Sequence, residues 1–242
     1  MPPTIRESQS VQSQPQADLR SLTKERRLFV QLQVFGNVTD PAGLKEVLKA
    51  SSIESVLYLN LHDPQGVGLL LMSEDPTVLM NEARAILSRS PCAGLRHQQE
   101  MTLVGMTYPS GHESDLNDWL LARPRRILLN AQWPWVIWYP LRRKPEFALF
   151  EPSEQRAILS EHAKLGRTYG EAELATDIRL CCYGLDRNDN EFVLGLVGPT
   201  LLPLSCLIQD MRKTQQTAKY IQSMGPFFVG KVYWQSLPKN TD

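Results

Sequence analysis

The sequence lacks the features that mark nucleic-acid-binding and membrane-spanning proteins. Its 26 basic residues are balanced by 26 acidic ones, so the broad positive field of a sequence-tolerant nucleic-acid binder is absent. No apolar run approaches the roughly 20 residues that a helix needs to cross a bilayer. We therefore expect neither nucleic acid nor a membrane as a partner.

Cysteine is scarce and shows no metal or redox pattern. The four cysteines include no CxxC pair, and the adjacent Cys181 and Cys182 would point to opposite faces of a strand. Residues 1–26 begin without the apolar stretch of a secretory signal and are rich in Ser, Gln and Pro, so we expect a disordered arm there. A cytoplasmic location fits these features; an organelle-targeting segment is the alternative, which Glu7 and Asp18 disfavour.

Hydrophobic patterning in the first half predicts two strand pairs and two helices. An alternating run, LFVQLQVF, is typical of a strand, and Asp40-Pro41 and Asp75-Pro76 are typical helix starts. The resulting order is β-α-β-β-α-β, the ferredoxin-like arrangement. The expected strands are 28–35, 53–61, 67–72 and 96–108, and the expected second helix is 75–88.

The second half repeats the order of elements without repeating the sequence. Its expected strands are 135–141, 177–183, 191–197 and 227–234, and its expected helices are 153–167 and 203–223.

Two such units can bury the apolar faces of their sheets against each other. The fold class that we expect is therefore α+β, with two ferredoxin-like β-α-β-β-α-β halves packed as a pseudo-symmetric dimeric α+β barrel. The predicted divisions are an arm (1–26), an N-terminal half (27–108), a linker (109–132), a C-terminal half (133–236) and a tail (237–242).

His162 is the histidine whose spacing sets it apart. It follows Ile158 by four residues in the predicted helix, so it lies on the same face as that apolar residue and points inward. One interpretation is a core histidine with satisfied hydrogen bonds. The other is a metal ligand, and because no second histidine or cysteine stands at zinc-ligand spacing, the metal would then be one already held by a cofactor, such as haem.

An aromatic strand followed by cations is the second candidate feature. In WPWVIWYPLRRK, Trp135, Ile137 and Tyr139 share one face, and Arg142 and Arg143 follow. Guanidinium groups bind carboxylates in a bidentate manner, as an anionic macrocycle would require. Solvated surface charge and a buried aromatic core are the alternative interpretations.

Five segments together resemble the chlorite dismutase family, and within it the coproheme decarboxylase branch. They keep the family's order and approximate spacing over roughly residues 123–234. The segments are WVIWYPLRRK, SEHAKLGRTY, CCYGLDRNDNEFV, IQDMRKTQQTAKY and GPFFVGKVY.

The resemblance implies a role for several residues in the C-terminal half, which carries the haem pocket in this family. His162 corresponds to the proximal haem ligand, and Tyr139 to the tyrosine that forms a radical in coproheme decarboxylases. Four further residues fall at positions where the family has groups that hold the haem propionates. Among them, Arg143 replaces a usual lysine and Thr217 a usual serine. That set is Arg125, Arg143, Arg167 and Thr217.

The residue opposite the histidine departs from the family pattern. Counting seven residues back from Gly184 gives Asp177, where chlorite-decomposing members have arginine and many decarboxylases have glutamine. Chlorite decomposition is therefore not expected. Because the segment after His162 is two residues longer than usual, Arg179 is an alternative counterpart. Asp177 either moves a proton during peroxide cleavage or pairs with Arg179 or another arginine.

The function expected from these features is peroxide-dependent decarboxylation of coproheme, or a related haem-dependent oxidation. The cofactor would be haem b or coproheme, and porphyrin and peroxide would be the small-molecule ligands. One alternative is a haem peroxidase that uses Asp177, and another is a haem-binding or carrier protein without catalysis. The resemblance also implies a homo-oligomer, with a homopentamer favoured.

Overall fold

The computed structural model describes residues 25–109, 111 and 113–237. The predicted arm, 1–26, therefore lies almost entirely outside the described residues, as does most of the predicted tail, 237–242.

Ten strands and five α-helices follow one another along the described chain. The strands are β1 (Phe29–Gly36), β2 (Glu54–Asn60), β3 (Val67–Ser73), β4 (Arg96–His97), β5 (Leu103–Thr107), β6 (Trp135–Arg143), β7 (Thr176–Cys181), β8 (Phe192–Gly198), β9 (Ile221–Met224) and β10 (Phe228–Gln235). The helices are α1 (Pro41–Lys49), α2 (Pro76–Leu87), α3 (Arg123–Leu128), α4 (Pro152–Glu171) and α5 (Leu201–Arg212). Every strand pairing is antiparallel, which confirms the predicted α+β class.

Local sequence signals fix where the first two helices begin. The side chain of Asp40 accepts a hydrogen bond from the Gly43 N–H, and the side chain of Asp75 accepts one from the Thr77 N–H at 2.8 Å. Each cap is followed by a proline, whose missing N–H has no partner to lose in the first turn.

The strands form one sheet that closes on itself. Its order is β10-β2-β3-β1-β5-β7-β8-β6, and β10 also pairs with β6, which completes the ring. β4 and β9 are short additions that pair with β1 and β6. The symmetry of the two halves stays a prediction.

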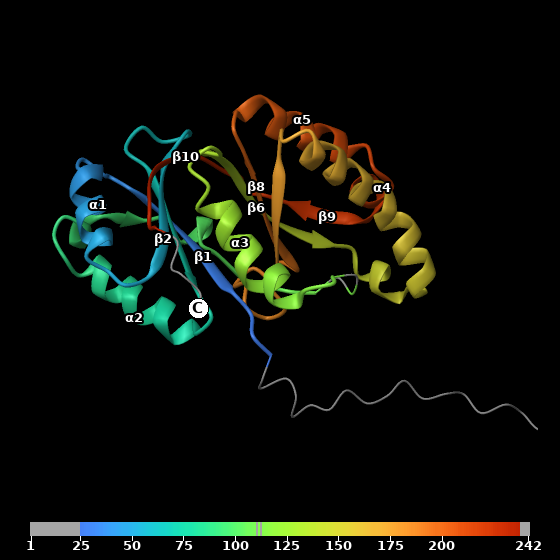
Figure 1. Cartoon of the computed structure of the whole chain (residues 1–242), viewed down its shortest axis with the longest axis horizontal. Coiled ribbons are helices and arrows are strands. Elements are labelled where there is room, and N and C mark those ends of the chain that lie inside the picture. The colour runs from blue at the N-terminus through green and yellow to red at the C-terminus, as the bar shows by residue number, and fades with distance from the viewer. Residues whose placement is uncertain (1–24, 110, 112, 238–242) are drawn as a thin grey trace, which may run out of the picture.

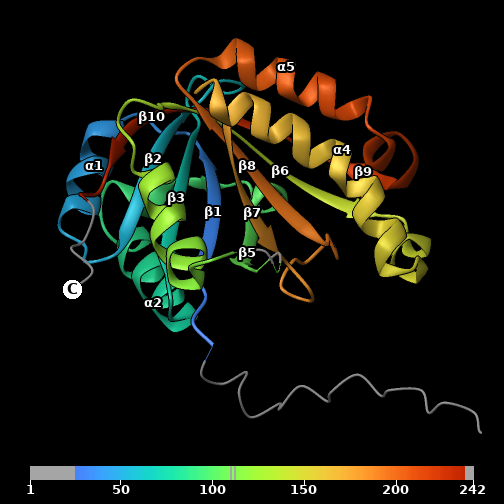
Figure 2. The same ribbon diagram turned by 45° about the vertical axis from the view of Figure 1, so that its right-hand side comes forward.

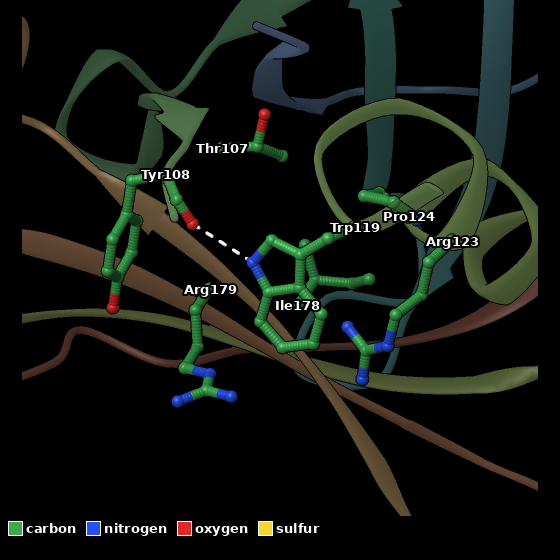
Figure 3. Close-up of a pocket in the computed structure, with 7 residues that line it drawn as sticks. All are labelled: Thr107, Tyr108, Trp119, Arg123, Pro124, Ile178 and Arg179. Atoms are coloured by element: carbon green, nitrogen blue, oxygen red, sulfur yellow. Dashed lines mark hydrogen bonds between the residues drawn. The ribbon is translucent and has the colours of Figure 1, made fainter. Parts of the chain in front are cut away.

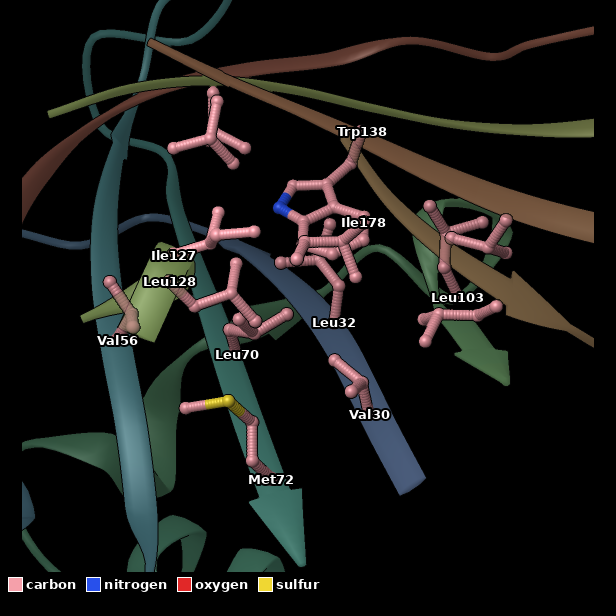
Figure 4. Close-up of a cluster of buried hydrophobic side chains, with 14 of the residues drawn as sticks. Val30, Leu32, Val56, Leu70, Met72, Leu103, Ile127, Leu128, Trp138 and Ile178 are labelled. Carbon is pink, nitrogen blue, oxygen red and sulfur yellow. The ribbon is translucent and has the colours of Figure 1, made fainter. Parts of the chain in front are cut away.

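The inside of this ring is a packed hydrophobic core, not a pore (Figure 4). Trp138 of β6 is fully buried at its centre. A Cβ atom at Gly195 would lie 2.6 Å from the Trp138 ring, so glycine is required there. α3 also contributes Ile127 and Leu128 to this core. Side chains of the described residues therefore fill the interior, and a site for a large ligand is expected on the outer faces of the ring.

The helices pack on the outer faces of the ring as two separate layers (Figures 1 and 2). α1 and α2 pack against β1, β2 and β3 of the N-terminal half. α5 packs against β6, β8 and β10, and α4 lies beside it (Figure 2).

Two predicted elements are wrong in extent. The predicted helix 203–223 ends at Arg212, because the chain turns at Gln216–Tyr220 and then forms β9, which pairs with the edge of β6. The backbone hydrogen bonds of that edge outweigh local helix propensity. The predicted strand 96–108 is broken into β4 and β5 by a turn at Gln99–Met101.

The segment predicted as a linker contains structure of its own. A π-helical turn, Asp118–Ala122, leads into α3, and both bury leucines in the core. In the part of the chain that the structure describes, none of the helices combines the length and the apolar character needed to cross a bilayer.

Candidate functional site

The outer face of the C-terminal half brings several predicted site residues into two neighbouring rows. Tyr139 and Arg179 both pair with Leu194, so these three side chains form one row across β6, β8 and β7. Asp177 pairs with Leu196, one row away on the same face. Adjacent strands lie about 4.8 Å apart, so the row from Tyr139 through Leu194 to Arg179 spans two strand spacings.

His162 faces this sheet from α4, as the four-residue spacing from buried Ile158 predicts. Its side chain is half-buried, and its Nδ1 atom is buried with no hydrogen-bond partner among the described residues. Burial lowers the pKa of His162, while the nearby Asp177 carboxylate acts in the opposite direction. The ring is therefore held neutral, with a lone pair available on one nitrogen.

Asp177 is held by two arginines from different elements. Its Oδ2 lies 2.9 Å from Nε of Arg179, and its Oδ1 lies 3.7 Å from a terminal nitrogen of Arg123 on α3. The sequence allowed two roles for Asp177, proton transfer or pairing with an arginine, and the structure shows the pairing with Arg179. Both arginines therefore hold the Asp177 carboxylate on the face of the sheet that His162 approaches from α4.

Tyr139 is buried on this face, with 4% of its surface exposed. Its ring stacks on Phe227 at a centroid distance of 4.8 Å. Burial raises the pKa of Tyr139, and the charge of Asp177 raises it further. None of the described residues hydrogen-bonds its hydroxyl, so the phenol is held as a neutral group whose proton is not committed to a neighbour.

Arg125 and Arg143, two of the predicted propionate ligands, are already paired with glutamates. Arg143 forms a bidentate pair with Glu191, with one Nε–Oε2 distance of 2.9 Å, and its guanidinium also covers the ring of Phe192. Arg125 pairs with Glu54 at 2.7 Å. Glu54 lies on β2, so the structure places Arg125 with the N-terminal half and away from His162.

Arg167 and Thr217 are the remaining predicted ligands. Arg167 is exposed on α4, five residues after His162, and no described residue pairs with it. Thr217 lies in the turn after α5, where its hydroxyl is 3.3 Å from that of Thr214. These two therefore keep more capacity for a ligand than Arg125 and Arg143 do.

Two neighbours of this site were not predicted from the sequence. Gln216 carries a buried side-chain oxygen without a partner among the described residues, in the turn that contacts α4. Trp119 lies between Arg123 and Arg179. Neither stands in a recognisable motif, because both reach the site through long-range packing that local spacing does not encode.

Groups of three or more His, Cys, Asp or Glu side chains that could hold a bare metal ion are absent from the described residues. The four cysteines are free, and Cys92, Cys181 and Cys182 are buried. A metal ion bound by His162 would therefore need its other ligands from a cofactor.

One family model matches most of the chain. The chlorite dismutase family model matches residues 42–233. A haem-binding protein from Thermus thermophilus has 19% identity and a TM-score of 0.68, with 86% of this chain and 92% of that one covered. Chlorite dismutase from Candidatus Nitrospira defluvii, solved with imidazole, has 16% identity and a TM-score of 0.68, with 89% and 95% covered. Among curated proteins there is no match. The chain belongs to the chlorite dismutase family.

Proposed function

We propose that the protein binds an iron porphyrin, haem b or coproheme, with His162 as the single protein ligand of the iron. The observation that carries this proposal is the buried Nδ1 atom of His162, which has no partner among the described residues. A buried polar atom without a partner destabilises the folded state by about 1–3 kcal/mol. A ligand that binds the His162 ring and satisfies this atom would offset that loss of stability. Metals bind the neutral form of imidazole, the form that burial favours here.

Partly buried hydrophobic side chains on the sheet face beneath α4 support the proposed binding of a flat apolar ligand there. In the hydrophobic cluster on this face, partly buried members outnumber buried ones among the described residues, and they include Leu194, Phe227 and Met211. Side chains of this kind would contact a macrocycle, and Arg167 and Thr217 would hold its propionates. Arg143 would have to exchange Glu191 for a propionate.

The proposed activity is peroxide-dependent decarboxylation of coproheme. When bound, the iron porphyrin supplies one-electron oxidation driven by peroxide. The chain supplies Tyr139, whose raised pKa keeps its phenol protonated, so its oxidation to a radical would release both an electron and a proton. Asp177, fixed by Arg179 and Arg123, supplies a carboxylate that can accept and return a proton.

The test is to load the purified chain with coproheme, titrate it with peroxide and follow the porphyrin mass. We expect the stepwise loss of two carboxyl groups, and we expect Tyr139→Phe to stop it. Tyr233→Phe, at an exposed tyrosine on β10, is the matched control and should behave like the parent. An intact porphyrin after full titration would refute the decarboxylase activity. Loss of the histidine-ligated absorption band in His162→Ala tests the ligand separately.

A second candidate is a haem peroxidase or a haem carrier without propionate chemistry. It is favoured by the pairing of Arg125 and Arg143 with glutamates, which leaves fewer cations for the four propionates of coproheme. For a peroxidase, Asp177→Asn would slow peroxide-driven dye oxidation while Tyr139→Phe would not. A carrier would take up haem through His162 and show no peroxide turnover.

Assembly as a homopentamer belongs to the same proposal and rests on family resemblance alone. Light scattering on the purified chain gives the molar mass that tests it, and a monomeric mass would refute it.

A further inference from the structure

The short helix α3 contacts both halves of the molecule through two of its arginines. Arg123 and Arg125 are two positions apart, which is a rotation of about 200° around a helix, so their side chains leave on nearly opposite sides. Ile127 and Leu128 of the same helix are packed in the core of the ring, which fixes the rotation of the helix (Figure 4). The two arginines therefore reach different parts of the sheet.

Arg123 binds β7 beside the candidate site. One terminal nitrogen lies 3.7 Å from the Asp177 carboxylate, and the other donates to the Asp177 carbonyl oxygen at 3.3 Å. The guanidinium carbon lies 4.7 Å from the centroid of the Trp119 ring, within the range of a cation–π interaction (Figure 3). Arg123 is therefore held by Trp119 and itself holds both the main chain and the side chain of Asp177.

Arg125 binds the N-terminal half on the other side of the helix. Its Nε atom lies 2.7 Å from Oε2 of Glu54 on β2, and the two side chains are 13% and 6% exposed. The second carboxylate oxygen of Glu54 is buried and has no partner among the described residues. Removing one partner of such a pair leaves the other as an uncompensated buried charge. The position of α3 therefore depends on Glu54.

A second contact holds the end of α3 from the same side. The side-chain amide of Gln235, on β10, donates a hydrogen bond to the carbonyl oxygen of Leu129 at 2.5 Å. Leu129 follows Arg125 by four residues, and its N–H donates to the Arg125 carbonyl oxygen at 2.9 Å, so both contacts lie on one face of the helix. β10 pairs with β2, with Gln235 opposite Val56. Two paired strands thus hold α3 on the side opposite to Asp177.

We propose that Glu54, in the N-terminal half, is a positioning residue for Asp177 and acts through α3. The contacts with Glu54 and Gln235 fix the helix, and Arg123 carries that position to the Asp177 carboxylate. The effect on catalysis rests on the proposed function, in which Asp177 transfers a proton. The contact between Glu54, α3 and β7 is independent of haem.

Hydrogen exchange of the full chain without added haem tests this contact. Glu54→Gln should speed exchange by local opening in α3 and β7, and Gln235→Met, which removes one hydrogen bond, should do so to a smaller extent. Asp118→Asn is the matched control, because Asp118 pairs with Arg126 of the same helix at an exposed position, and it should leave β7 unchanged.

Circular dichroism establishes that each variant is folded, and Gln235→Met decides the test if Glu54→Gln does not fold. Unchanged exchange of β7 in the folded variants of Glu54 and Gln235, or an equal increase in Asp118→Asn, would overturn the proposal.

Peroxide-driven dye oxidation by the haem-loaded chain tests the positioning role. Because displacing a catalytic group by about 1 Å can slow a reaction about 100-fold, we expect Glu54→Gln to lower kcat by about tenfold and to leave KM for the dye unchanged. Gln235→Met should give a smaller loss. In an Asp177→Asn background neither substitution should lower kcat further, because both act through Asp177.

Equal losses of kcat with and without Asp177 would overturn the positioning role. A parent without peroxide turnover would contradict the proposed function instead, and the exchange experiment would still decide whether Glu54 acts on β7.

Discussion

The two helical layers of this molecule are built differently although both cover strands of the same sheet. Under α1 and α2, most members of the hydrophobic cluster are buried. Under α4 and α5, the partly buried members outnumber the buried ones among the described residues. α2 buries Leu79, Ala83 and Ile86 over 12 residues, whereas α4, with 20 residues, buries only Ile158. The hydrophobic side chains of the first layer are therefore buried more completely than those of the second.

Polar contacts hold α4 in place where apolar burial does not. The Tyr169 hydroxyl donates to Asp210 of α5 at 2.8 Å, and Glu161 accepts a hydrogen bond from the Gln215 N–H at 2.8 Å. Such contacts fix a helix beside its neighbour without pressing it onto the sheet. The comparison teaches that the C-terminal layer gains less from hydrophobic burial, so a ligand between α4 and the sheet has more stabilisation to add.

The largest expected effect compares one leucine from each layer. Leu48 of α1 is 1% exposed, and Leu48→Ala should lower the free energy of unfolding by about 2–5 kcal/mol because it leaves a cavity. Leu165 of α4 is partly exposed, and Leu165→Ala should cost about 1 kcal/mol or less. Urea denaturation of both variants measures the difference. Equal losses would mean that α4 is packed as tightly as α1.

The next effect tests whether a ligand closes the second layer. Haem at a hundredfold excess over its dissociation constant should stabilise the fold by about 2.7 kcal/mol. Hydrogen exchange by local opening should slow in α4 and β7 and stay unchanged in α1. His162→Ala should remove both effects. Slowing that is equal in α1 and α4 would show that haem does not act through the C-terminal layer.

A smaller effect isolates the bond between α4 and α5. Tyr169→Phe removes the hydrogen bond to Asp210 and should cost about 1 kcal/mol, as is usual for one hydrogen bond. Asp210 also pairs with Lys213, so a double-mutant cycle with Asp210→Ala, which removes the acceptor, is needed to separate the two contacts. Strict additivity in the cycle would show that the hydroxyl contributes nothing to holding α4.

Sequence patterns predicted those parts of the site that depend on local periodicity. Alternation placed Ile137 and Tyr139 opposite Trp138, and the structure confirms these faces. The four-residue spacing from Ile158 likewise placed His162 toward the sheet. The periodicity of apolar residues within a strand or helix predicts the folded structure well, because it reflects which face of the element is buried.

Contacts between distant residues could not be predicted in this way. Glu54 and Arg125 are separated by 71 positions, and Arg143 and Glu191 by 48. Each arginine matched a family position for propionate binding, yet each has a glutamate from a distant segment of the chain as its partner. The end of α5 was missed for a related reason, because the strand edge of β6 that captures β9 is distant in sequence.

The smallest effect is a pH dependence that differs between the layers. Burial lowers the pKa of His162 in the folded chain, so the unfolded chain binds a proton more readily. The stability that His162 contributes is therefore fully present above its unfolded pKa of about 6.5 and is lost as the pH falls through the lower folded value. His97, in the N-terminal half, has a pKa that burial also lowers, so the parent alone cannot assign the effect.

Urea denaturation of the parent and of His162→Gln isolates this contribution, because Gln keeps a polar side chain and does not titrate. The measurements run from about pH 7.5 downward, a range that spans the usual histidine pKa. The stability of the parent relative to His162→Gln should fall as the pH falls, because protonating the buried ring costs more in the folded state. Parallel curves would mean that the ring opens to water freely. In that case α4 would not bury His162 against the sheet, and the difference between the layers would be one of exposure, not of space for a ligand.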